Sequence, residues 1–73
     1  MAIECKELAS ETIRGDVAVA RVLACRVGDD FYVCATLEWD GGNTEQERRC
    51  HDEADAIAHF ALACRWARSE LGK

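Results

Sequence analysis

The sequence predicts an α+β fold in which a small antiparallel β-sheet is packed by a long C-terminal helix. Two segments rich in β-branched and aromatic residues are separated by turns of glycine and aspartate, and a polar segment follows them. The last third of the chain is rich in alanine, with acids at its start and bases towards its end, which is typical of a helix. We expect three strands, or four, preceded by a short N-terminal helix.

Length and composition bound the function. The chain has 73 residues, of which 49% are hydrophobic, and its net charge is −5. This length corresponds to one small domain, residues 1–73. A chain of this size buries only about 60% of the surface that its unfolded form exposes. Little room remains for a core and a walled catalytic pocket, so we expect a protein that is not an enzyme.

The first segment, residues 2–14, has two interpretations. Cys5, Leu8, Ala9, Thr12 and Ile13 follow the spacing of one helix face, and Gly15 is a residue type that commonly ends helices. As a strand, the same segment would add a fourth member to the sheet. We favour the helix, which gives the order α-β-β-β-α.

Two strands are expected over "DVAVARVLACRV" and "FYVCATLEW". The odd-numbered positions of both carry most of the large apolar side chains, namely Val17, Val19, Leu23, Cys25 and Val27, then Phe31, Val33, Ala35, Leu37 and Trp39. Pairing Val27 with Phe31 through a three-residue loop would bury both sets together. This register places Cys25 and Cys34 on opposite faces, so we expect no disulfide between them.

The polar segment "TEQERRCH", residues 44–51, is expected to be a short third strand at the sheet edge. Charged side chains at an edge discourage pairing with other chains. An irregular loop is the alternative interpretation.

The C-terminal helix has the clearest signals. Asp52 is expected to cap it, with Asp55 three residues on, and Gly72 to end it. The expected core stripe consists of Ile57, Phe60, Ala61, Cys64 and Leu71. Trp66 falls roughly opposite Ile57, with Leu62 beside it. It would either complete the core over the N-terminal segment or contact a partner.

Residues with reactive or metal-binding side chains do not form a recognisable site. The five cysteines include no C-x-x-C pair, and we interpret them as reduced thiols that fill apolar space. His51, Asp55 and His59 are four residues apart, but no second cluster completes a metal site. We expect no metal and no cofactor. The chain lacks a signal-like start and a long apolar run, so we expect a cytoplasmic location without membrane contact.

The predicted order of elements is similar to that of the double-stranded-RNA-binding domain. That family contacts phosphates through lysines at the start of its last helix, where this chain has His51, Asp52 and Asp55. The resemblance therefore implies the fold and not the function. Acids outnumber bases by 14 to 9, and phosphate binding depends on basic residues, so we expect no direct nucleic-acid binding.

In length, acidity and architecture the chain also resembles the small phage-encoded inhibitors of bacterial defence, notably the anti-CRISPR proteins. This resemblance implies a phage protein that acts in the bacterial host cell. Many proteins of that kind occupy a basic nucleic-acid channel or a subunit surface of a larger complex.

Our hypothesis is a non-enzymatic protein that binds and inhibits or modulates a larger protein or ribonucleoprotein complex through that complex's basic surface. The acids would steer association, and an aromatic and an aliphatic residue would anchor it. The candidate partner-binding residues are Asp29, Asp30, Glu38, Asp40, Asp52, Glu53, Asp55, Leu62 and Trp66. One alternative is a homodimeric structural or regulatory subunit, antitoxin-like, whose helix packs on its own copy and buries Trp66. A less favoured alternative is an RNA-binding module.

Overall fold

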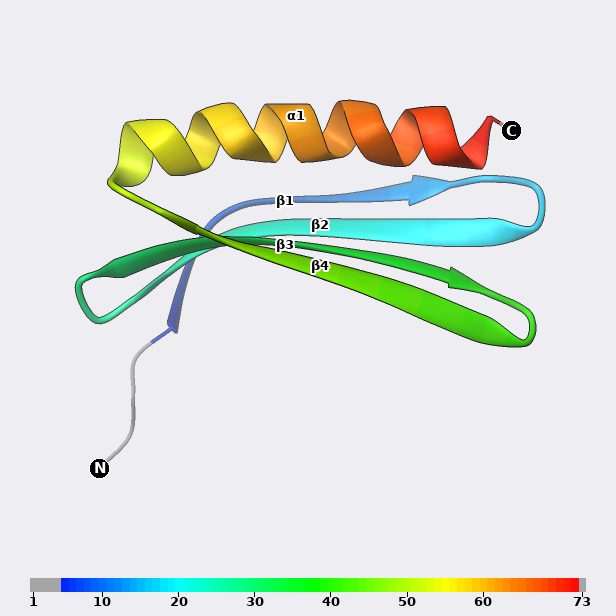
Figure 1. Cartoon of the computed structure of the whole chain (residues 1–73), viewed down its shortest axis with the longest axis horizontal. Helices are drawn as coiled ribbons and strands as arrows, with labels where there is room; N and C mark the ends of the chain where they lie inside the picture. Colours follow the sequence, from blue (N-terminus) through cyan, green and yellow to red (C-terminus); the bar gives the residue numbers. More distant parts are fainter. Residues whose placement is uncertain (1–4, 73) are drawn as a thin grey trace.

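The computed structural model describes residues 5–72 as four strands followed by one helix. The strands are β1 (Cys5–Arg14), β2 (Ala18–Val27), β3 (Asp30–Trp39) and β4 (Gly42–Cys50), and the helix is α1 (Glu53–Leu71). The strands form one antiparallel sheet in the order β1-β2-β3-β4, and α1 lies lengthwise over one face of it (Figure 1). The predicted α+β class is confirmed, and so is an edge strand over most of residues 44–51.

The prediction of an N-terminal helix is wrong for residues 5–14, which form β1; residues 2–4 lie outside the described part of the chain. A β-bulge explains the misleading pattern. Glu7 pairs with Cys25 and Ala9 pairs with Ala24, so Leu8 is an extra residue in the strand. A bulge reverses the side-chain alternation. The apolar positions before and after it therefore imitate the spacing of three and four that a helix would show.

The predicted register between the two central strands is also wrong. Val27 pairs with Asp30, so the loop has two residues, Gly28 and Asp29, instead of three. Gly28 has a φ of 62°, whereas Asp29 is not among the residues with positive φ. A glycine in this conformation at the first central position is typical of the II′ turn, whose twist suits a two-residue hairpin. The turn chemistry therefore determines the register.

This register decides which side chains face the helix. The even-numbered Ala20, Val22 and Ala24 of β2 lie opposite Leu37, Ala35 and Val33 of β3, and all but Leu37 are buried in the core cluster with α1. The larger odd-numbered side chains of β2 point to the other face of the sheet. The predicted common face of odd-numbered residues does not exist.

Helix α1 has the predicted ends but a displaced core stripe. Asp52 is the N-cap and Gly72 the C-cap. Ala56, Cys64 and Ala67 are the buried residues of the helix, whereas Ile57 is 45% exposed and Ala61 is exposed as well. Small side chains on the central line let α1 approach a sheet face that is itself made largely of alanine and valine. Bulkier residues, Phe60, Trp66 and Leu71, pack at the margins of the cluster.

The buried core contains no large side chain. Every buried hydrophobic residue of the described chain is an alanine, a valine or a cysteine, and Val22 is the largest side chain that is fully buried. The described leucine, isoleucine, phenylalanine and tryptophan residues all keep some exposure. The two layers therefore leave much apolar surface accessible. Over residues 5–72, no helix is long and apolar enough to cross a membrane.

Candidate protein-binding surfaces

The sheet has one face that no other described element covers, which we call the open sheet face. Because α1 packs on the side of Ala20, Val22 and Ala24, the alternate side chains of each strand point away from it. Cross-strand pairs of Leu23 with Cys34 and of Cys25 with Tyr32 form its centre. These side chains make an apolar strip across the two middle strands.

Carboxylates flank this strip on both sides. Glu45 and Glu47 of β4 lie opposite Thr36 and Cys34, and Glu7 of β1 pairs with Cys25. None of the three glutamates has an ion-pair partner within residues 5–72. The flanks of the strip therefore carry uncompensated negative charge.

The other acids of the open sheet face are paired. Arg21 contacts Glu38 at 3.0 Å, and Arg49 contacts Asp30 at 2.8 Å. All four residues sit at cross-strand positions of the same face. These exposed pairs cancel their own charges, so Glu7, Glu45 and Glu47 dominate the potential of the middle of the face.

Three cysteines, Cys5, Cys25 and Cys34, lie on the open sheet face, and the pKa values of Cys25 and Cys34 are raised. Burial raises the pKa of Cys25 to about 11, with further increases from the charge and the hydrogen bond of Cys5. Burial, followed by the charges of Glu47 and Glu45, raises the pKa of Cys34. A protonated thiol is a poor nucleophile and behaves as a small apolar group. Cys25 and Cys34 are both free, and they share a face instead of lying on opposite faces as expected.

A second surface is a groove of about 630 Å³ between α1 and the β3–β4 side of the sheet. Buried residues of β3 form its floor, exposed residues of β4 form one wall, and α1 forms the other. Its main lining residues are Val33, Ala35, Gln46, Arg48, Leu62 and Trp66. Trp66 thus packs against the core cluster, but towards β3 and β4 and not over the N-terminal segment.

The candidate partner-binding residues do not gather in one patch. Asp29 and Asp30 lie at the β2–β3 turn, at the same end of the sheet as the start of α1 with Asp52, Glu53 and Asp55 (Figure 1). Glu38 and Asp40 lie at the opposite end, by the β3–β4 turn, and Leu62 and Trp66 line the groove. Whether any of these residues contacts a partner stays a prediction.

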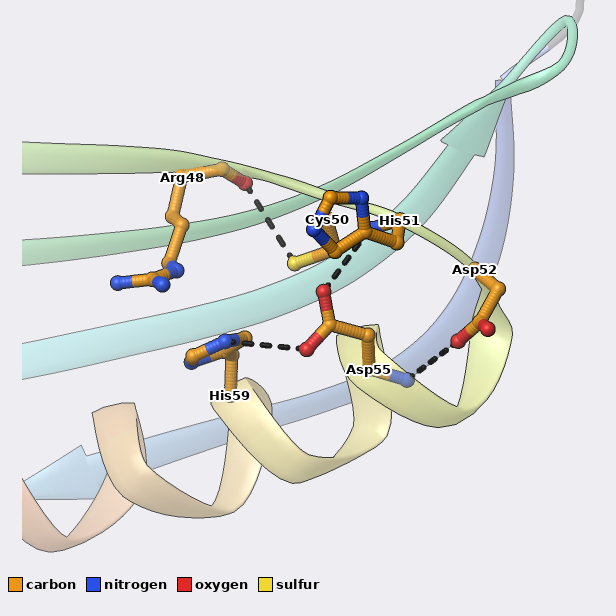
Figure 2. Close-up of polar contacts among 6 residues, drawn as sticks. All are labelled: Arg48, Cys50, His51, Asp52, Asp55 and His59. Carbon is orange, nitrogen blue, oxygen red and sulfur yellow. Dashed lines mark hydrogen bonds and ion pairs between the residues drawn. The ribbon is translucent and has the colours of Figure 1, made fainter.

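Two of these acids, Asp52 and Asp55, have local structural roles at the start of α1, which Figure 2 shows. The Asp55 backbone N–H donates to Oδ1 of Asp52 at 2.8 Å. The Asp55 carboxylate accepts from the His51 backbone N–H at 2.9 Å and lies 3.1 Å from Nε2 of His59. The His51 hydrogen bond is the main cause that lowers the pKa of Asp55, and the charge of His59 adds to it. These contacts stabilise the helix N-terminus.

His51, Asp55 and His59 have the residue types and the spacing of possible metal ligands in the sequence. In the part of the chain that the structure describes, no group of three or more His, Cys, Asp or Glu side chains could hold a metal ion. Figure 2 shows the His51 backbone in contact with Asp55, whereas His59 lies one turn further along α1. Asp55 links the two residues through its two oxygens.

The open sheet face was not predicted from the sequence. Its residues include Leu23, Tyr32, Glu45 and Glu47. The miss follows from the register, because a shift by one residue moves a whole set of side chains to the other face. The signal that could have found it is the Gly28-Asp29 pair, which favours a two-residue hairpin.

Comparison with protein-family models, with curated proteins and with solved structures finds no match to this chain.

Proposed function

We propose that this protein is a non-enzymatic binding protein that modulates a larger partner by docking its open sheet face on a basic surface. The observation that carries the proposal is the apolar strip around Leu23 and Tyr32, flanked by the unpaired Glu7, Glu45 and Glu47. An apolar centre supplies affinity through burial, and surrounding charges select a partner of opposite sign.

The net charge of −5 supports the same conclusion. A negative protein is drawn to a positive surface over distances of about a Debye length, which raises the association rate. Basic surfaces of this kind are typical of complexes that handle nucleic acid. The resemblance in size and acidity to anti-CRISPR inhibitors indicates the same class of partner, in a bacterial host cell, for a phage-encoded protein.

Direct binding of nucleic acid is disfavoured on the same surface. Phosphates would meet Glu7, Glu45 and Glu47, and the exposed Arg21 and Arg49 are already paired with carboxylates. Counterion release, the main source of phosphate affinity, needs free lysine or arginine. The open sheet face is therefore better suited to compete with nucleic acid for a basic surface than to bind nucleic acid itself.

The test is capture of a partner from bacterial lysate, followed by binding measurements with the purified partner. The key variant is Glu45→Lys/Glu47→Lys, which reverses charge on the open sheet face without changing the core. We expect salt-sensitive binding by the wild type, displacement of nucleic acid from the partner, and at least a tenfold weaker affinity for the variant, corresponding to about 1.4 kcal/mol.

The matched control is Asp40→Lys/Glu53→Lys, which makes the same change in net charge away from this face. If Glu45→Lys/Glu47→Lys binds the partner normally and the control variant does not, the binding surface is formed by the acids predicted from the sequence and not by the open sheet face. Tight binding of duplex RNA by the wild type at low salt would contradict the proposal altogether.

A further inference from the structure

The groove beside Trp66 exists because one helix is too narrow for this sheet. Neighbouring strands lie about 4.8 Å apart, so the outer strands are separated by roughly 14 Å, whereas a helix is about 10–12 Å wide. Helix α1 buries residues of β2 and β3. On β4, every residue from Gly42 to Arg49 is exposed and Cys50 alone is buried. The helix-side face of β4 is therefore uncovered.

Large apolar side chains of α1 border this uncovered area. Leu62 is 53% exposed and lines the groove together with the half-buried Trp66. On the outward side of the helix, Ala54, Ala58 and Ala61 are also exposed. Because the buried core holds nothing larger than valine, much of the apolar content of the helix is still available for an interface.

We infer that the occupant of this groove is α1 of a second copy of the chain, packed antiparallel to the first helix. Two features of α1 make it complementary to itself. Its first turn carries the exposed Glu53 and its second half the exposed Arg65, and neither has an ion-pair partner within residues 5–72, whereas Asp55 and Arg68 already contact His59 and Glu11. An antiparallel pair places each acidic start beside the more basic part of the other helix, and it opposes the two helix dipoles favourably.

The groove lies beside the middle of α1, where His59, Leu62 and Trp66 line it. The exposed alanines allow two helix axes to approach closely, so that each Leu62 can enter the groove next to the other copy's Trp66. A two-fold axis makes this contact twice, and each groove is filled by the partner.

The competing mode of self-association is pairing of two β4 edges into one continuous sheet. Glu45, Glu47, Arg48 and Arg49 crowd this edge strand, and charges on an edge oppose such pairing. The helix pair leaves the open sheet face free, so the dimer does not depend on the proposed partner-binding function.

The experiment is sedimentation velocity of the full chain between about 1 and 200 µM, a range that brackets the dissociation constants of weak to moderate dimers. We expect a species of twice the 8.1-kDa chain mass. Leu62→Glu should raise the dimer dissociation constant at least tenfold. The matched control is Val17→Glu, because Val17 is 84% exposed and lies outside the groove; it should leave the dimer intact.

A second variant and a second readout keep the test independent of helix stability. Gln46→Lys places a charge in the groove from β4 without altering α1, and it should also weaken the dimer. In a Trp39→Phe background, the emission of Trp66 should shift to longer wavelength on dilution, as the dimer dissociates and the indole gains water contact. A wild-type chain that stays monomeric throughout the range would overturn the inference. A dimer that persists in both groove variants, with unchanged Trp66 emission, would overturn it equally.

Discussion

Asp52 and Asp55 form a reciprocal cap at the start of α1. The Asp52 side chain accepts from the Asp55 backbone N–H at 2.8 Å, and the Asp55 side chain reaches back to the His51 backbone N–H at 2.9 Å (Figure 2). Two backbone donors are satisfied in this way, as in a capping box, except that Asp55 accepts from the residue before the N-cap. The cap also connects α1 to β4, because His51, which donates to Asp55, directly follows the last residue of that strand, Cys50.

Removal of the N-cap side chain should weaken the whole fold, because α1 covers the face of the sheet that carries the core cluster. We expect Asp52→Ala to lower the free energy of unfolding by about 1 kcal/mol, measured by urea denaturation followed by circular dichroism. Asp40→Ala is the control, since Asp40 lies in the exposed β3–β4 turn. An equal loss in both variants would argue against the cap as the cause.

The pH dependence of stability should depend on Asp55. Its pKa is lowered in the folded protein, so the unfolded state binds the proton more tightly, and the stabilisation is present above the ordinary carboxyl pKa of 3.8. It is lost as pH falls through the lowered folded pKa. We expect Asp55→Asn to be less stable than the wild type at pH 7 and to lose less stability between neutral and strongly acidic pH. If the free energy of unfolding changes with pH in the same way in both proteins, Asp55 does not contribute to the pH dependence.

The alanines of α1 that face the sheet should tolerate no enlargement. Ala67 is fully buried, and Ala67→Leu inserts three carbon atoms where the helix and sheet are in contact. We expect a loss of about 1–3 kcal/mol from overpacking, measured by thermal and urea unfolding. Ala58→Leu makes the same change at an exposed position of the same helix and should have little effect on the unfolding of the monomer.

The β2–β3 turn should depend on glycine at position 28. Gly28 has a φ of 62°, and an added Cβ would meet no heavy atom within 4 Å. Any cost of substitution therefore comes from the backbone conformation and not from crowding. We expect Gly28→Ala to lose about 1–2 kcal/mol, and Gly28→Asn to lose less, because asparagine adopts positive φ more readily. Equal losses would point to a different cause.

The stability of the protein should decline in alkaline solution partly because of Cys64. Burial, followed by the hydrogen bond and charge of Glu11, raises its pKa from 9.0 to about 11. The folded state therefore holds the thiol proton more tightly, so this contribution is complete below pH 9 and is lost as pH rises through 11. Cys64→Ala should show a shallower decline than the wild type from pH 9 to 11. The free energy of unfolding at each pH would be measured with urea. An equal decline of that free energy with pH in the two proteins would refute this assignment.

The accuracy of the sequence predictions varied with the range of the interactions involved. The cap at Asp52, the end at Gly72 and the strand over most of residues 44–51 depend on near neighbours, and these features are confirmed. The first segment failed because the extra Leu8 in β1 reverses the alternation within one strand. The single bulge made a strand look like one face of a helix.

The candidate surface residues show the same division. Leu62 and Trp66 were selected for their position on the helix, and the structure places both beside the groove. The acids were selected for their charge alone, and the structure distributes them over two ends of the sheet. Glu45 and Glu47 were not among the candidate partner-binding residues, because their place on the open sheet face depends on β3 as much as on β4.

The sequence by itself determined the class of the fold, the ends of the helix and the acidic character of the surface, because these depend on composition and on contacts within a few residues. Only the tertiary structure decided which face of the sheet the helix covers. Both faces of β2 are apolar enough to be buried, and a two-residue turn at Gly28 selected the face of small side chains. Alanine and valine permit the closest approach of helix and sheet, and this packing left Leu23 and Tyr32 on the open sheet face.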